Sequence, residues 1–385
     1  MNQPQSVPEN GRRKRILTLL TLTLVGAGLV YGAYWGLHGR YRESTDDAYV
    51  AGNLLRVTPR VAGTVTAVLV DDTDFVKRGQ VLVKLEDTDA RVALQQAEAN
   101  LANTVRQVRQ LFDLAAQEKA NVDVKTLALQ QAQADVQRRD GSDMGQAVSR
   151  EEVEHAQVAV ARAKAELDLA RAALSGTEAQ VADTTVADHP AVKQAAEKVR
   201  AAWLALERCN IRAAEDGYIA QRSVQVGQQL AVGAPLMVVV PLHQLWVDAN
   251  FKEDQLKRLR IGQPVELDSD LYGSKVAFHG KVVGLAPGTG SVFSLLPPQN
   301  ATGNWIKIVQ RVPVRVALDE AELAKHPLRV GLSINAVVNT SDTDGPSLAS
   351  GSVAGRYETT VYQNEAAPAD KLVEQIIAAN LGKRA

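Results

Sequence analysis

Apolar residues recur with different spacings along this chain of 385 residues, and each spacing predicts a different kind of element. Residues 16–37 are apolar or small throughout, whereas residues 57–85 and 211–239 alternate apolar with polar positions. Residues 88–208 repeat apolar positions every seven residues. These patterns predict a membrane-spanning helix, half-buried β-strands and a helical coiled coil. We therefore expect a membrane-attached protein with several domains of α and β structure.

The apolar segment 16–37 is long enough to cross a lipid bilayer. It carries no charge, and its 22 residues would span roughly 33 Å as a helix. A cleaved signal peptide has a shorter apolar core and a small-residue cleavage site, which this segment lacks. Basic residues should stay on the cytoplasmic side, so residues 38–385 are expected beyond the membrane. The residues expected to set this topology are Arg12, Arg13, Lys14 and Arg15.

Residues 57–85 and 211–239 form an internal repeat. The two segments align without a gap at an offset of 154 residues, so that Val65, for example, meets Ile219. Neither copy is long enough to bury its own apolar face, so we expect the two halves to form one small β-sandwich. Glycines are expected where the chain turns or approaches another backbone closely. These lipoyl-like turn glycines are Gly63, Gly79, Gly217 and Gly233.

This repeat resembles the two halves of a biotinyl or lipoyl carrier domain. In that family a tight hairpin between the halves presents a lysine for attachment of the cofactor. Here about 120 residues take the place of that hairpin, which implies a scaffold without a cofactor. A cofactor-carrying enzyme subunit is the alternative, and lipoate or biotin found on any lysine would support it.

The segment between the two copies has the composition and spacing of a helical hairpin. It is rich in good helix formers, and both arms carry apolar seams. Glycines interrupt the seams near residues 140–149, and Ser149 with Glu152 predicts a capping box that restarts the helix. Pro190 should break the returning arm. The seam residues are Leu94, Leu101, Val108, Ala115, Val122, Leu129 and Val136 on the first arm, and Val153, Val160, Leu167, Leu174 and Val181 on the second.

The C-terminal part of the chain predicts a β-barrel followed by a tail. Residues 242–340 carry short apolar runs separated by glycine and proline, which is typical of antiparallel strands. Residues 251–259 predict a short amphipathic helix within this part. The composition of residues 341–356 indicates a flexible linker, and residues 372–381 predict a short terminal helix.

Composition and motifs narrow the classes of function. The formal net charge of −1 gives no electrostatic reason to expect nucleic acid as a partner. The lone cysteine, Cys209, excludes a disulfide within the chain, and the six histidines lack the spacing of metal ligands. The sequence contains no GxSxG, P-loop or HExxH motif. We therefore expect a protein that is not an enzyme and that has no cofactor or metal.

Several longer motifs resemble those of the HlyD-type membrane fusion proteins, and most closely those of the EmrA-type multidrug efflux adaptors. They are TDDAYV at 45–50, SREE at 149–152, AAWLALERCNI at 201–211, WVDANFKE at 246–253 and GTGSVFSLLPPQNATGNWIKIVQRVPVRV at 288–316. The resemblance covers roughly residues 40–345. The resulting domain order is a cytoplasmic tail (1–15), a transmembrane helix (16–37), the first lipoyl-like half (46–87), an α-helical hairpin (88–208), the second lipoyl-like half (209–241), a β-barrel (242–340), and a linker with a C-terminal tail (341–385).

The resemblance implies a periplasmic adaptor anchored in the inner membrane of a Gram-negative bacterium. Its expected partners are an inner-membrane transporter of the major-facilitator type, which would be a drug/proton antiporter, and a TolC-like outer-membrane channel. Ring-like assembly of several copies of the chain is also implied. An adaptor for type I polypeptide secretion, working with an ATP-binding cassette transporter, is the alternative. A self-assembling coiled coil without any contact at its tip is another.

Related adaptors carry an Arg, Leu and Ser pattern at the hairpin tip, with Leu four and Ser eleven residues after Arg. Arg138 and Ser149 fit this spacing, but Ser142 stands where leucine is expected. Met144 and Val148 are the nearby apolar residues that could replace the leucine contact. The resemblance thus implies that Arg138, Ser142, Met144, Val148 and Ser149 contact the channel.

Overall fold

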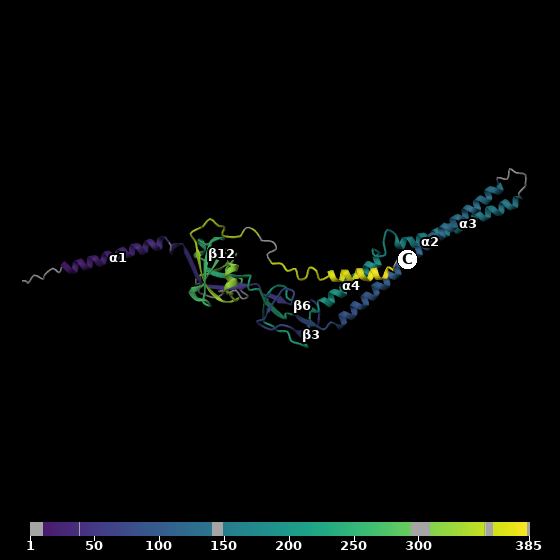
Figure 1. Ribbon diagram of the computed structural model, residues 1–385. Helices are drawn as coiled ribbons and strands as arrows, with labels where there is room; N and C mark the ends of the chain where they lie inside the picture. Colours follow the sequence, from purple (N-terminus) through teal and green to yellow (C-terminus); the bar gives the residue numbers. More distant parts are fainter. Residues whose placement is uncertain are drawn as a thin grey trace, which may run out of the picture.

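The computed structural model describes residues 11–37, 39–140, 149–293, 309–349, 351 and 357–382. This part of the chain is elongated (Figure 1). Helix α1 (Gly11–Leu37) lies at one end, and the tip end of a hairpin made by α2 (Thr88–Asp140) and α3 (Arg150–Val181) lies at the other. A β-barrel and a two-sheet domain lie between them. The predicted fold class is confirmed: an apolar N-terminal helix, a helical hairpin inserted into a split lipoyl-like β-sandwich, and a β-barrel.

Helix α1 exposes its apolar side chains along its length. The candidate membrane span Ile16–Tyr41 has a mean hydropathy of 1.9, and none of its most apolar window is buried inside the protein. The hydroxyls of Thr21 and Thr23 donate to the carbonyls of Leu17 and Leu19 within the helix. Polar groups in lipid need such internal partners because no water is available to them. Both its composition and its internal hydrogen bonds therefore suit a lipid environment.

A closed barrel of six antiparallel strands follows the span. Its order is β1-β10-β13-β12-β11-β14. Phe251 and Phe278 are among its largest fully buried side chains. Short helical segments η1 (Gly39–Tyr41), η2 (Gln255–Lys257), η3 (Gly273–Lys275) and α5 (Glu320–Lys325) flank the strands. The strands are β1 (Arg42–Gly52), β10 (Leu245–Lys252), β11 (Pro264–Ser269), β12 (Ala277–Leu285), β13 (Arg311–Leu318) and β14 (Ser333–Asn339).

Two sequence-based boundaries in the barrel need correction. Residues 46–52 were expected in the first lipoyl-like half, but they belong to β1, which pairs with β10 and β14. Nothing in the local sequence of residues 46–52 specifies which sheet this strand joins. The amphipathic helix expected over residues 251–259 is wrong as well. Phe251 pairs with Val312 and points into the barrel, so only the short turn η2 is helical there.

The internal repeat folds as a sandwich of two four-stranded sheets, with the orders β2-β9-β7-β4 and β6-β5-β3-β8. The 154-residue offset relates β2, β3, β4 and β5 to β6, β7, β8 and β9, and so converts one order into the other. Each sheet takes two strands from each copy, so neither copy could form its sheets alone. The strands are β2 (Leu55–Val57), β3 (Gly63–Val68), β4 (Phe75–Val76), β5 (Val81–Leu85), β6 (Asn210–Arg212), β7 (Gly217–Ala220), β8 (Gln229–Leu230) and β9 (Met237–Val240).

The four glycines of the repeat fall into two kinds. Gly79 and Gly233 lie in turns, with φ angles of +78° and +83°. Glycine adopts this left-handed conformation without the steric cost that a Cβ atom brings. Gly63 and Gly217 are not turn residues, because they begin strands β3 and β7. Gly217 packs closely against Val239 and Val240, whereas the space at Gly63 would accept a Cβ atom at ordinary contact distance.

The hairpin arms pack along the predicted seams. Helix α2 has 53 residues, or roughly 80 Å at helical rise. Each predicted seam residue is buried or half-buried, because each arm turns one face to the other. The predicted break of the returning arm is confirmed: α3 ends at Val181, and α4 (Pro190–Glu207) begins with Pro190 at its start. Proline is tolerated there because the first helical N–H has no partner within the helix.

A three-helix bundle forms the base of the hairpin. Helix α6 (Ala367–Asn380) lies beside α4 and α2 (Figure 1). Its buried Val373 joins a cluster that includes Leu101 and Val105 of α2 and Val199 of α4. The tail expected over residues 341–385 therefore needs correction, because residues 357–382 return to the hairpin. The terminal helix also begins earlier than the predicted residue 372.

Candidate docking sites at the tip and base of the hairpin

Two of the five residues expected to contact an outer-membrane channel lie in the described part of the tip. Arg138 is in the last turn of α2, with 74% of its side chain exposed and a contact to Asp135 at 3.2 Å. Ser149 directly precedes α3. The structure therefore places a basic residue and a helix cap at the tip end of the arms. Ser142, Met144 and Val148 lie outside the described residues.

Ser149 closes a complete capping box at the start of α3. Its Oγ accepts a hydrogen bond from the Glu152 backbone N–H at 3.2 Å. The Glu152 carboxylate accepts one from the Ser149 N–H at 3.1 Å. Two N–H groups that the helix itself leaves free are thus satisfied. The predicted helix start is confirmed, and Ser149 has a local structural role.

We expect Ser149→Ala to loosen the first turn of α3. The change removes the side-chain acceptor, which typically stabilises a helix by about 1 kcal/mol. Amide hydrogen exchange of residues 151–153 should accelerate. Ser149→Asp, which keeps an acceptor at the same place, is the matched control and should exchange close to the unchanged chain. Equal exchange in the alanine and serine chains would contradict a capping role.

Charged contacts fix how the arms oppose each other. The Lys125 Nζ of α2 lies 2.9 Å from the Glu166 carboxylate of α3, and Arg162 contacts the same carboxylate from one turn away. The hydrogen bond from Lys125, followed by that from Arg162, lowers the pKa of Glu166. Lys125 and Glu166 therefore lie at the same height along the hairpin.

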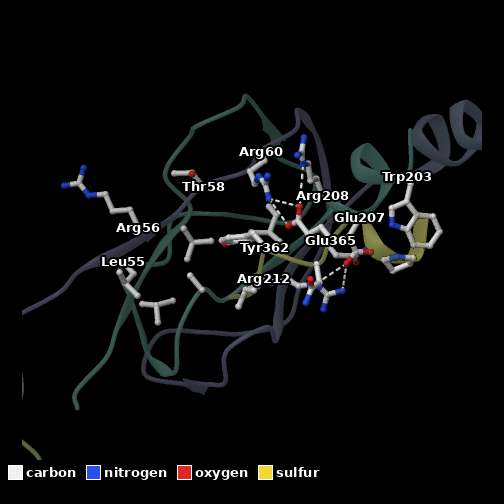
Figure 2. Close-up of a pocket in the computed structure, with 18 residues that line it drawn as sticks. Leu55, Arg56, Thr58, Arg60, Trp203, Glu207, Arg208, Arg212, Tyr362 and Glu365 are labelled. Carbon is white, nitrogen blue, oxygen red and sulfur yellow. Dashed lines mark hydrogen bonds and ion pairs between the residues drawn. The ribbon is translucent and has the colours of Figure 1, made fainter. Parts of the chain in front are cut away.

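A pocket of about 480 Å³ lies at the hairpin base, where β2, β6, the end of α4 and residues 361–368 meet. Figure 2 shows its charged side chains. Glu365 lies between two arginines: Arg60 Nη1 donates to both carboxylate oxygens at 2.8 and 3.0 Å, and Arg208 lies 4.0 Å away. The Arg60 guanidinium also covers the Tyr362 ring at 5.0 Å. Burial raises the pKa of the Tyr362 phenol.

The side chains around the base pocket make structural contacts within the protein. Among the described residues, no group of three or more His, Cys, Asp or Glu side chains could hold a metal ion. Cys209 is buried beside the base, and this burial raises the pKa of its thiol, which disfavours the reactive thiolate. The residues around the pocket instead form ion pairs and apolar contacts. Such groups can hold two parts of a protein together.

Sequence reasoning missed the base as a site. Glu365 and Tyr362 were placed in the tail, and Arg60 was a polar position in a strand repeat. One signal was available: Leu372, Val373, Ile376 and Ile377 recur at the spacing of an amphipathic helix. A helix with an apolar face implies a surface that covers it. That surface could not be identified from the local pattern.

Comparison with known proteins decides the family. Residues 88–209 match the model of the EMRA alpha-helical hairpin domain. The multidrug export protein EmrA of Escherichia coli strain K12 is 49% identical over 379 residues, which cover 98% of this chain and 97% of that protein. The chain belongs to the EmrA family of membrane fusion proteins. The fatty acid resistance protein FarA of Neisseria gonorrhoeae is 45% identical, over 95% of this chain and 92% of its own length.

The match to the EmrA hairpin model also divides the base bundle into two parts. It spans α2, α3 and α4 and ends at residue 209, just after α4. Helix α6 lies outside the match, although it packs on α2 and α4. The EmrA hairpin module in this chain therefore has its base covered by a segment from the far end of the sequence.

Proposed function

We propose that this chain is the periplasmic adaptor of a tripartite efflux pump. It would link an inner-membrane transporter of the major-facilitator type, a drug/proton antiporter, to a TolC-like outer-membrane channel. The observation that carries this proposal is the separation of the two ends (Figure 1). An apolar helix suited to lipid lies at one end, and the tip end of a long hairpin lies at the other. Membership in the EmrA family supports the same function.

The proposed topology follows from the basic cluster at the start of α1. With Arg12, Arg13, Lys14 and Arg15 on the cytoplasmic side, the barrel, the sandwich and the hairpin all lie in the periplasm. The barrel then lies closest to the inner membrane and the hairpin points away from it. In this arrangement, Arg138 and Ser149 lie at the end that would reach an outer-membrane channel.

The proposed cargo is hydrophobic toxic compounds. Two relatives that match nearly the whole chain carry names that refer to multidrug export and to fatty acid resistance. These names favour small apolar compounds over the polypeptides of type I secretion. We therefore prefer the hypothesis of an EmrA-type efflux adaptor to that of an adaptor for an ATP-binding cassette transporter.

Assembly into a ring-like homo-oligomer completes the proposal. A single hairpin has two arms and no interior, and most of its outer surface is exposed. Several copies side by side would be needed to enclose a path for a compound. Contacts between copies would also explain exposed apolar residues on the arms, such as Leu127 and Leu169, at 65% and 74% exposure.

Deleting the gene should sensitise cells to hydrophobic toxicants, and the intact chain should restore growth. A chain in which a short Gly-Ser turn replaces residues 88–208 should reach the membrane and fail to restore growth. Both chains would be compared by minimal inhibitory concentration and by immunoblots of membrane fractions. Full rescue by the hairpin-less chain would contradict a bridging function. Copurification of an ATP-binding cassette transporter would instead favour polypeptide secretion.

A further inference from the structure

The C-terminal segment 357–382 contacts three parts of the molecule: the two-sheet domain, helix α4 and helix α2. It contacts the two-sheet domain through Arg60, helix α4 through Arg200, and helix α2 through Arg106. These contacts join positions more than a hundred residues apart in the sequence. We propose that this segment is a clasp that fixes the angle of the hairpin against the two-sheet domain, and that Glu365 is its latch.

The covalent connections alone leave the hairpin with a hinge. Only two chain crossings join the hairpin to the two-sheet domain: residues 86–87 lead from β5 into α2, and residues 208–209 lead from α4 into β6. Two points of attachment define a line about which a rigid hairpin can rotate. A third attachment away from that line removes the rotation. Helix α6 and the residues before it supply such an attachment.

The domain end of the clasp is anchored by charge and by a hydrogen bond. Glu365 is only 16% exposed at its side chain, so water and salt screen its contacts with Arg60 and Arg208 less than those of a surface pair. The Thr359 hydroxyl donates to the Ala214 carbonyl of the two-sheet domain at 2.7 Å. The pocket in Figure 2 is thus partly closed by the clasp itself.

The hairpin end of the clasp is anchored by polar and apolar contacts together. The Arg200 Nε of α4 donates to the Asp370 carboxylate at 2.6 Å, and this hydrogen bond raises the pKa of Arg200. The Arg106 Nη1 of α2 donates to the Asn380 side-chain oxygen at 2.7 Å. Between these contacts, Val373 is buried in the base bundle. The segment is therefore held at both ends and along its middle.

The position of the hairpin tip depends on this angle. Because α2 alone is roughly 80 Å long, a rotation of about 10° at the base would move its far end by roughly 14 Å. Such a displacement is larger than the diameter of a helix. The consequence for export rests on the proposed adaptor function, whereas the clasp itself can be tested on the purified chain.

The test is Glu365→Arg in the full-length chain in detergent. The new cation would face Arg60 and Arg208, so the latch should open. Amides of α6 should exchange about tenfold faster or more. The distance distribution between spin labels at Leu69 of the two-sheet domain and Val158 of α3 should broaden. In cells, resistance to hydrophobic toxicants should fall while the amount of chain in the membrane stays unchanged.

Two further variants separate the latch from a general effect of charge. Glu374→Arg makes the same change on an exposed position of α6 and should alter none of the three readouts. Arg60→Glu combined with Glu365→Arg restores opposite charges and should recover part of the protection and part of the narrow distance distribution. Recovery in this pair would also show that Glu365→Arg had not simply unfolded the base.

Three results would overturn the proposal. One is unchanged exchange of α6 in Glu365→Arg, and another is an equal effect of Glu374→Arg. The third is a released α6 with an unchanged distance distribution, since the segment would then be anchored without positioning the hairpin. If the intact chain itself confers no resistance, the adaptor function fails, but the exchange and distance measurements still decide the clasp.

Discussion

A chain with both hairpin arms shortened by fourteen residues should stay folded in the membrane and lose export. The contact between Lys125 and Glu166 shows which segments oppose each other. Residues 115–128 lie opposite residues 163–176, so removing both shortens the arms equally. Each arm would lose roughly 21 Å. A tip that stops this far short cannot keep its contact with a partner fixed in the outer membrane.

The deletion keeps the seams in phase because it removes two complete seven-residue repeats. Leu129 takes the place of Ala115 on the first arm, and Val181 takes the place of Leu167 on the second. The base bundle, including α4 and α6, is untouched. Membrane levels and helical content per residue should therefore stay close to those of the intact chain. Export would be measured as the minimal inhibitory concentration in the deletion strain.

The matched control keeps the length and changes the sequence. In that chain, the same fourteen positions of each arm keep their seam residues and the exposed Leu127 and Leu169, and carry Ala, Glu and Lys elsewhere. It should restore resistance, since reach depends on length. Loss of resistance in both chains would point to a side-chain contact along the arms. Full resistance of the shortened chain would contradict a bridge between two membranes.

The hairpin was predictable because its determinants are local. Seam residues recur within a few turns, and the capping box at Ser149 and the break before Pro190 each depend on neighbours in the sequence. The sandwich was predictable for another reason. The repeat revealed that two halves had to complete each other, although the interleaved strand order was not visible in it. In the first copy of the repeat, Thr73 takes the place of Gly227 and adopts a similar positive φ, 75° against 83°. Because threonine rarely adopts this conformation, the sequence alone did not reveal the turn.

The sequence-based predictions that were wrong concern strands and side chains whose contact partners are distant in the sequence. Residues 46–52 of β1 were assigned to the wrong domain because local sequence does not specify a neighbouring strand, and β1 pairs with β10 about 200 residues later. The contact of the C-terminal tail with the hairpin base was missed because the Arg60–Glu365 contact joins residues 305 positions apart. Long-range contacts of this kind depend on the whole fold. The channel contacts at the tip stay a prediction, since Ser142, Met144 and Val148 lie outside the described residues.

Gly217→Ala should destabilise the two-sheet domain far more than Gly63→Ala, although the two glycines are equivalent in the repeat. A Cβ atom at Gly217 would lie 2.7 Å from the Val240 carbonyl oxygen and 2.8 Å from a Val239 methyl carbon. At Gly63 the nearest atoms belong to the Leu85 side chain, at an ordinary 3.5 Å. Overpacking against backbone typically costs about 1–3 kcal/mol. We expect Gly217→Ala to lower the free energy of unfolding of this domain by about 3 kcal/mol.

Native-state hydrogen exchange of β5, β7 and β9 amides in the full-length chain would measure both variants. A loss of about 3 kcal/mol in opening free energy corresponds to exchange faster by a factor of about 100 or more. Gly63→Ala should stay within about 1 kcal/mol, because the added methyl group fits and restricts the unfolded chain. Equal losses would mean that the repeat imposes one role on both positions. A difference would mean that the second half, which closes the sandwich after the hairpin, is packed more tightly than the first.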